Sequence, residues 1–148
     1  MDKWKADQQI QDQIPVLIAN HHPHLTDISD KIIVIFKEKC SKKGDEKILG
    51  KTSKAPAILS VVSSDEFKFI IELGQDEWLL LDAKQQTALL DHQLCFIGGE
   101  EDEKTCVMKY FLRQPDIYYF TEEVARNGNW RPLPESTENK DEDNENEL

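Results

Sequence analysis

The longest helical pattern in the chain constrains its fold most. It spans residues 76–99, DEWLLLDAKQQTALLDHQLCFIGG. Asp82 is suited to cap a helix that begins near Ala83, because an aspartate side chain accepts hydrogen bonds from the first backbone N–H groups of a helix. The pair Gly98 and Gly99 predicts the end of this helix. A helix of this length and apolar content must be covered by another layer of secondary structure.

Strand patterns supply that second layer. Residues 31–39 are rich in β-branched side chains, residues 66–73 alternate in polarity, and residues 104–112 form a third short apolar segment. Short segments rich in β-branched side chains and segments of alternating polarity are both typical of strands. A hairpin is predicted around Gly44-Asp45, which is a turn sequence. The apolar segment 55–62 is compatible with either a strand or a helix.

Two further helices are predicted near the ends of the chain. In residues 7–19 the side chains of Ile10, Ile14 and Leu17 share one helical face, although Pro15 lies inside the pattern. A second helix is expected to run from Asp116 to the Asn127-Gly128 pair. Together these patterns predict an α+β fold, with a small mixed or antiparallel sheet of roughly three to five strands packed on the central helix.

Composition indicates one domain with an acidic tail. The 148 residues carry a formal net charge of −11. We expect a single α+β domain over residues 1–133 and a disordered acidic tail over 134–148, which has no aliphatic residue before its last position. No apolar run is long enough for a transmembrane helix, and the polar N-terminus lacks the apolar core of a signal peptide. The three cysteines, Cys40, Cys95 and Cys106, favour a reducing cytoplasm over a disulfide framework.

Residues 92–96 nearly match the zinc-protease motif H-E-x-x-H. His92 fills the first position, but Gln93 replaces the glutamate and Phe96 replaces the second histidine. The motif works because two histidines one helical turn apart reach one zinc ion, while the glutamate deprotonates the zinc-bound water. A phenylalanine cannot bind metal, and a neutral amide cannot act as a general base. Hydrolysis of this type should therefore be absent or very slow.

Other uses of these residues stay open at this point. A residual zinc site could use His92 with Cys95, or His92 with a histidine from His21, His22 and His24. The alternative is a helix in which Leu89, His92 and Phe96 point inward and His92 is a hydrogen-bonded core histidine. The three histidines around Pro23 are better explained as a polar helix terminus than as a metal cluster.

Several segments together resemble the phage metallopeptidase family, small zincin-like proteins of phages and mobile elements. In that family the central helix contains Ala-Leu-Leu-Asp-His followed by Glu-Leu-Cys-His, which is similar to ALLDHQLCF here. The resemblance covers roughly residues 10–131. It is also carried by IPVLIANHHPHL, GKTSKAPAIL, DEFKFIIELGQDEW and PDIYYFTEEVARNGNW.

The resemblance implies a zincin-like core whose site has been lost. It would place the metal ligands at His92, at the position of Phe96, and at Pro115, where the family has a histidine before Asp116. The base would fall at Gln93. Only one of these positions keeps its chemistry, so the resemblance implies a pseudoenzyme with no catalytic residues and no cofactor. A residual zinc-binding protein that uses His92 is the alternative.

A fold kept without catalysis is expected to bind a partner. We expect a non-catalytic, acidic binding or inhibitor protein of phage or mobile-element type in the cytoplasm of a bacterial host. Its partner would be a host protein with a basic surface, such as a defence, nuclease or transcription component. The candidate binding residues are Asp116, Tyr118, Tyr119 and Glu122. Direct nucleic-acid binding through the lysine-rich residues 37–54 is disfavoured by the net negative charge.

Overall fold

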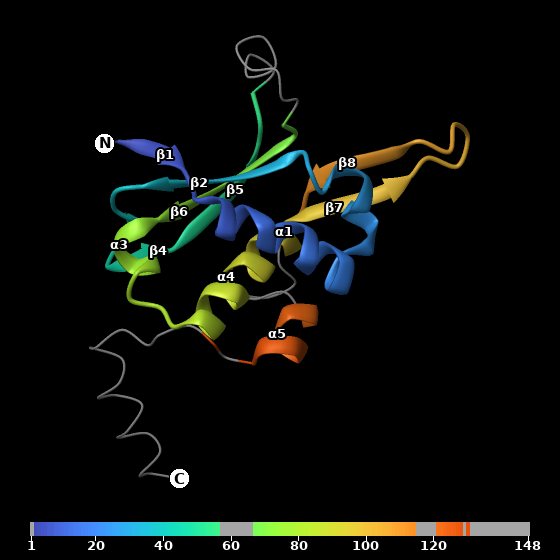
Figure 1. Ribbon diagram of the computed structural model, residues 1–148. Helices are drawn as coiled ribbons and strands as arrows, with labels where there is room; N and C mark the ends of the chain where they lie inside the picture. The colour runs from blue at the N-terminus through green and yellow to red at the C-terminus, as the bar shows by residue number, and fades with distance from the viewer. Residues whose placement is uncertain (1, 57–66, 115–120, 129, 131–148) are drawn as a thin grey trace.

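A four-stranded mixed sheet forms the centre of the protein (Figure 1). The computed structural model describes residues 2–56, 67–114, 121–128 and 130. The strand order is β1-β2-β6-β5, and β2 runs parallel to β6 while the two outer strands are antiparallel to their neighbours. The strands are β1 (Lys3–Lys5), β2 (Ile32–Lys37), β5 (Gly50–Lys54) and β6 (Phe69–Gly74). The predicted α+β class and the two predicted strands at 31–39 and 66–73 are confirmed.

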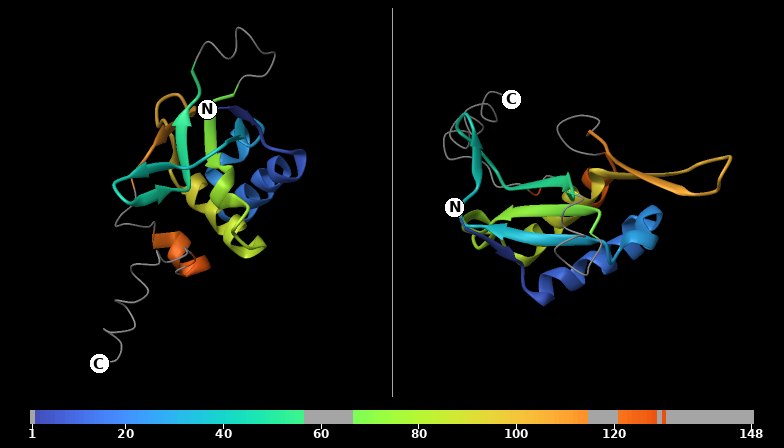
Figure 2. Two further views of the ribbon diagram at one scale, coloured as in Figure 1. Left: turned by 90° about the vertical axis from the view of Figure 1, so that its left-hand side faces the viewer. Right: turned by 90° about the horizontal axis from the view of Figure 1, so that it is seen from above.

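Two long helices lie together on one side of this sheet (Figures 1 and 2). Helix α1 (Gln8–His21) contacts β2, and helix α4 (Ala83–Cys95) contacts β5 and α1. In β2 buried residues alternate with partly exposed ones, because successive side chains of a strand point to opposite faces. Pro15 lies inside α1, which nevertheless continues through it and buries Ile14. A short helix, α3 (Gln75–Trp78), follows β6, and a 3-10 helix, η1 (Pro23–Ile28), follows α1.

The central helix begins as predicted but ends earlier. The Asp82 side chain accepts a hydrogen bond from the Gln85 backbone N–H, and the Gln85 side-chain oxygen accepts one from the Asp82 backbone N–H, which forms a capping box. The predicted stop at Gly98 and Gly99 is wrong, because both glycines belong to strand β7 (Ile97–Glu101). The Phe111 ring lies over Gly98, so a Cβ atom at this position would be 2.4 Å from the ring and would require the ring to move.

Two hairpins project from the central layers. Strands β3 (Ser41–Lys43) and β4 (Glu46–Ile48) form the predicted hairpin, with Gly44 at a positive φ of 65° in its turn. Strand β7 pairs with β8 (Met108–Leu112) in an arm that extends away from the body (Figure 1). The predicted strand 104–112 is correct from residue 108 onward, whereas the residues before it form the connection between β7 and β8.

Helix α5 (Thr121–Asn127) packs against α4 (Figure 1). All residues from Ala88 to Cys95 on α4 are buried. The sheet, α1 and α5 therefore cover the second half of α4 on several sides, so polar side chains there must find partners within the protein. Among the described helices, none has the length and apolar character that crossing a bilayer requires. The predicted tail and most of segment 55–62 fall outside the described residues.

Candidate functional site

The histidine of the zinc-protease pattern is held by a buried carboxylate. His92 is 3% exposed, and its Nδ1 atom shares a hydrogen bond with an oxygen of Glu123 on α5. The second oxygen of Glu123 accepts a hydrogen bond from the Trp130 indole at 3.3 Å. Histidines that bind metals commonly donate their other ring N–H to such a carboxylate. This supporting arrangement is therefore present around His92.

The other two positions of the pattern are used for packing. The Phe96 ring meets the His92 ring edge-on, with centroids 5.1 Å apart. Gln93 is 2% exposed and faces β5, where the Thr52 hydroxyl lies 2.8 Å from its side-chain oxygen and 3.0 Å from its backbone oxygen. Gly50 leaves room for the same side chain, because a Cβ atom there would be 2.9 Å from the Gln93 amide nitrogen. Gln93 is thus locked between the helix and the sheet edge.

These side chains do not fit a catalytic zinc ion. Such an ion needs three protein ligands with a bound water, and a base beside the water. Phe96 offers hydrocarbon at a ligand position, and Gln93 offers a neutral amide at the position of the base. Of the presumed ligands, only the imidazole of His92 has a suitable donor atom, and Pro115 lies outside the described residues.

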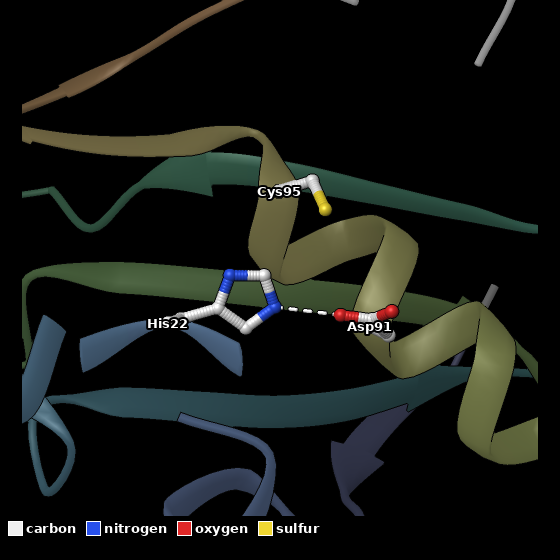
Figure 3. Close-up of side chains that lie close together, drawn as sticks. All are labelled: His22, Asp91 and Cys95. Atoms are coloured by element: carbon white, nitrogen blue, oxygen red, sulfur yellow. Dashed lines mark hydrogen bonds and ion pairs between the residues drawn. The ribbon is translucent and has the colours of Figure 1, made fainter. Parts of the chain in front are cut away.

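A second polar cluster surrounds Asp91, the residue that directly precedes His92 on α4 (Figure 3). The His22 Nε2 atom is 2.6 Å from an oxygen of Asp91, and both residues are 2% exposed. From α5, Arg126 donates to the two Asp91 oxygens at 2.9 and 2.8 Å. Asn127 adds a further hydrogen bond at 2.9 Å. The cluster joins α1, α4 and α5 through a single carboxylate.

Cys95 completes this cluster. It lies one turn after Asp91, and its sulfur is 3.7 Å from an Arg126 guanidinium nitrogen. The donor atoms of His22, Asp91 and Cys95 all lie within 4.8 Å of one another, and all three residues are buried. Figure 3 shows the three side chains converging from α4 and the end of α1.

The surroundings fix the protonation of this cluster. Burial works to raise the pKa of the Asp91 carboxyl, but hydrogen bonds from His22 and Arg126 and the charge of Arg126 outweigh it, so this pKa lies well below its usual range. Burial raises the pKa of the Cys95 thiol well above its ordinary value, and the charges of Asp91 and Glu122 raise it further. Asp91 is therefore ionised at neutral pH, and Cys95 carries its proton.

Three predictions about these residues need correction. His21 and His22 lie at the end of α1 as predicted, but only His21 is exposed, whereas His22 is buried and bonded to Asp91. Cys95 groups with His22 and Asp91 rather than with His92. The predicted inward stripe holds for Leu89 and His92, which are buried, but Phe96 is only partly buried because the helix ends before it.

The sequence reading missed Asp91, Glu123 and Arg126. The sequence does indicate that Asp91 lies close to Cys95, since the two are four residues apart and so share one face of a helix. Glu123 and Arg126 have the same relation on α5, at three residues. The partnership with α4 could not be read from spacing, because Asp91 and Arg126 are 35 residues apart.

The predicted partner-binding residues are mostly outside the described part of the chain, namely Asp116, Tyr118 and Tyr119. Glu122 is described and forms an ion pair with Arg113. In the lysine-rich hairpin region, Lys47 pairs with Glu77 at 2.5 Å and Lys37 lies 3.5 Å from Glu72. Because these two lysines pair within the protein, they fit a charged surface edge better than a nucleic-acid-binding site, which the net negative charge also disfavours.

A comparison with protein-family models agrees with the family resemblance seen in the sequence of α4. The family model described as "Putative phage metallopeptidase" matches residues 2–138. The chain belongs to this family. No curated protein and no solved structure matches it significantly. The phage metallopeptidase family thus includes a chain that lacks two essential groups of the H-E-x-x-H pattern at Gln93 and Phe96.

Proposed function

We propose that the protein is a non-catalytic member of the phage metallopeptidase family that acts by binding another protein. The observation that supports loss of catalysis most directly is the use of the motif positions for packing. Gln93 is hydrogen-bonded to Thr52 in the interior, and Phe96 covers the ring of His92. Neither side chain can supply the base or the second ligand of a zinc peptidase.

A binding role is supported by the arm formed by β7 and β8. Within the described strands, β8 pairs with β7 alone, and an edge strand of this kind is a surface to which a partner strand can add. Apolar side chains are exposed along the arm: Val107 is 59% exposed, Phe111 39% and Leu112 38%. Exposed apolar groups on a projecting hairpin are a feature of protein interaction sites.

The charge of the arm indicates the kind of partner. Its tip contains four consecutive acidic residues, 100–103, and one of them, Asp102, is paired with Lys109 at 3.2 Å. With a net charge of −11 on the whole chain, association with a basic protein surface would be accelerated electrostatically. The partner is therefore a protein with a basic surface, such as a nucleic-acid-binding defence or transcription component of a phage host. The predicted candidates Asp116, Tyr118 and Tyr119 remain part of this proposal.

The catalytic part of the proposal is tested with a peptide library and mass spectrometry, in the presence and absence of added zinc. We expect no cleavage above background for the wild type, and the same result for His92→Ala. Zinc-dependent cleavage by the wild type that disappears in His92→Ala would contradict the proposal, because it would show that His92 still holds a working ion.

The binding part is tested with matched valine variants. Val107 on the arm and Val16 on α1 are both 59% exposed, so replacing either with serine makes the same chemical change on a different surface. Immobilised protein is used to capture basic proteins from a host lysate at increasing salt. We expect a salt-sensitive complex that Val107→Ser weakens and Val16→Ser leaves intact. Equal capture by the two variants would exclude the arm as the binding surface.

A further inference from the structure

The cluster of His22, Asp91 and Cys95 has the composition of a transition-metal site. It offers one imidazole nitrogen, one carboxylate and one sulfur, all buried and with donor atoms within 4.8 Å of one another. Each of these three donor types is a common zinc ligand. The cluster does not include His92, Gln93 or Phe96, so it is separate from the degenerate H-E-x-x-H positions.

The three donors are held by regular structure. Asp91 and Cys95 lie one turn apart on α4, which is buried along this stretch. His22 is the C-terminal cap of α1, and its backbone N–H donates to Ile18 at 2.9 Å. Tetrahedral zinc places its ligands roughly 3.3 to 3.8 Å apart, so the present donor separations require movements of only about 1 Å. A change of that size is within the reach of side-chain rotations.

A positively charged side chain, that of Arg126, already lies against two of these donors. The guanidinium of Arg126 donates to both oxygens of Asp91 and approaches the sulfur of Cys95 at 3.7 Å. It therefore contacts two of the three donors that a metal ion would use. Arg126 comes from the short helix α5, and its side chain is 21% exposed, so it can move into solvent without crossing the core.

We propose that His22, Asp91 and Cys95 bind a zinc-class divalent cation, and that this ion replaces Arg126. As the ion enters, the two hydrogen bonds from Arg126 to Asp91 and the one from His22 to Asp91 break. The proton on His22 Nε2 is exchanged through solvent to Nδ1, which leaves the imidazole neutral with Nε2 free to bind the ion, and the Cys95 thiol releases its proton to solvent as the metal–sulfur bond forms. One positive charge leaves with Arg126, while the ion brings two and the thiol loses one. The net charge of the buried cluster is unchanged by the exchange, so no uncompensated charge is left in the interior.

With three protein ligands, the ion would take water as its fourth ligand, and its main effect would be on the packing of the helices. The ion would join the C-terminal end of α1 directly to α4, in the place where the hydrogen bond between His22 and Asp91 now makes that connection. It would also release α5 from one of its contacts with α4, because Arg126 would no longer hold Asp91. Binding of the ion is independent of whether the protein cleaves peptides.

Cobalt(II) is the probe that distinguishes this site from others, because a cobalt–thiolate bond gives a near-ultraviolet charge-transfer band. We expect the band in the wild type and in the Cys40→Ser/Cys106→Ser double variant, where Cys95 is the only remaining cysteine. We expect its loss in Cys95→Ser and no change in His92→Ala. Absence of the band from the double variant would overturn the proposal without requiring any change at the site itself.

Zinc affinity, measured by competition with a chromophoric chelator, tests the individual roles. His22→Ala should weaken binding roughly tenfold or more, since even the loss of outer support for a ligand costs this much. Arg126→Gln should tighten binding by about tenfold or more, because two charged hydrogen bonds no longer have to be broken. Thermal unfolding without metal verifies that each variant is folded. Unchanged affinity in either variant would overturn the assignment of these donors or the displacement of Arg126.

Discussion

Replacement of Asp91 by asparagine is expected to destabilise the protein strongly in the absence of metal. The carboxylate is 2% exposed and accepts four hydrogen bonds, from His22, Arg126 and Asn127. An asparagine side chain has the same shape, but its NH₂ group would face a donor of Arg126 or Asn127 and its charge is gone. The substitution therefore breaks the pair with Arg126 and leaves a buried donor without an acceptor.

The size of the loss follows from the burial of the two partners. Removing one member of a fully buried ion pair typically costs about 3–5 kcal/mol. Arg126 is one-fifth exposed and can turn partly towards water, which places the expected loss near the lower end, at about 3 kcal/mol. For a domain of this size, that loss lowers the melting temperature by roughly 10 °C. Chemical denaturation in the presence of a chelator measures it, with the exposed Asp30→Asn as the matched control.

The same variant makes a prediction about pH. The pKa of the Asp91 carboxyl is lower in the folded protein than in the unfolded chain, where it is about 3.9. The stability contributed by this carboxylate is therefore complete above that value and is lost as the pH falls through the folded pKa. The difference between wild type and Asp91→Asn should be constant near neutral pH and shrink below about pH 4. A difference under about 1 kcal/mol at neutral pH would refute the role given to this carboxylate.

Two further predictions concern the interior around α4. Thr52→Val keeps the shape of the side chain but removes the hydroxyl that donates to Gln93, so denaturation should show a loss of about 1–3 kcal/mol, and an unchanged midpoint would contradict this hydrogen bond. The three thiols should differ in reactivity. Cys106 is exposed, whereas Cys95 is buried. For Cys40, burial and the hydrogen bond to Asp76 raise the pKa of the thiol to about 12. A disulfide reagent should modify Cys106 rapidly in the native protein and the other two only on unfolding, whereas fast reaction of all three would contradict their burial.

Local chemistry was sufficient to predict most of the secondary structure. The start of α4 follows from Asp82, because a helix cap depends on hydrogen bonds within four residues. Strands β2 and β6 follow from their β-branched and alternating side chains, and the β3–β4 hairpin from Gly44. The error at Gly98 has a tertiary cause, because the glycine there makes room for Phe111 on the neighbouring strand.

The sequence by itself also determined that the H-E-x-x-H chemistry is incomplete, because the missing groups at Gln93 and Phe96 are a matter of residue type alone. Which polar groups meet was decided only by the tertiary structure. His22 and Asp91 are 69 residues apart, and Arg126 reaches the same carboxylate from a third helix. Periodicity reports which face of one helix is apolar, but α4 is buried from Ala88 to Cys95, so its polar residues are satisfied by neighbours that only packing brings within reach.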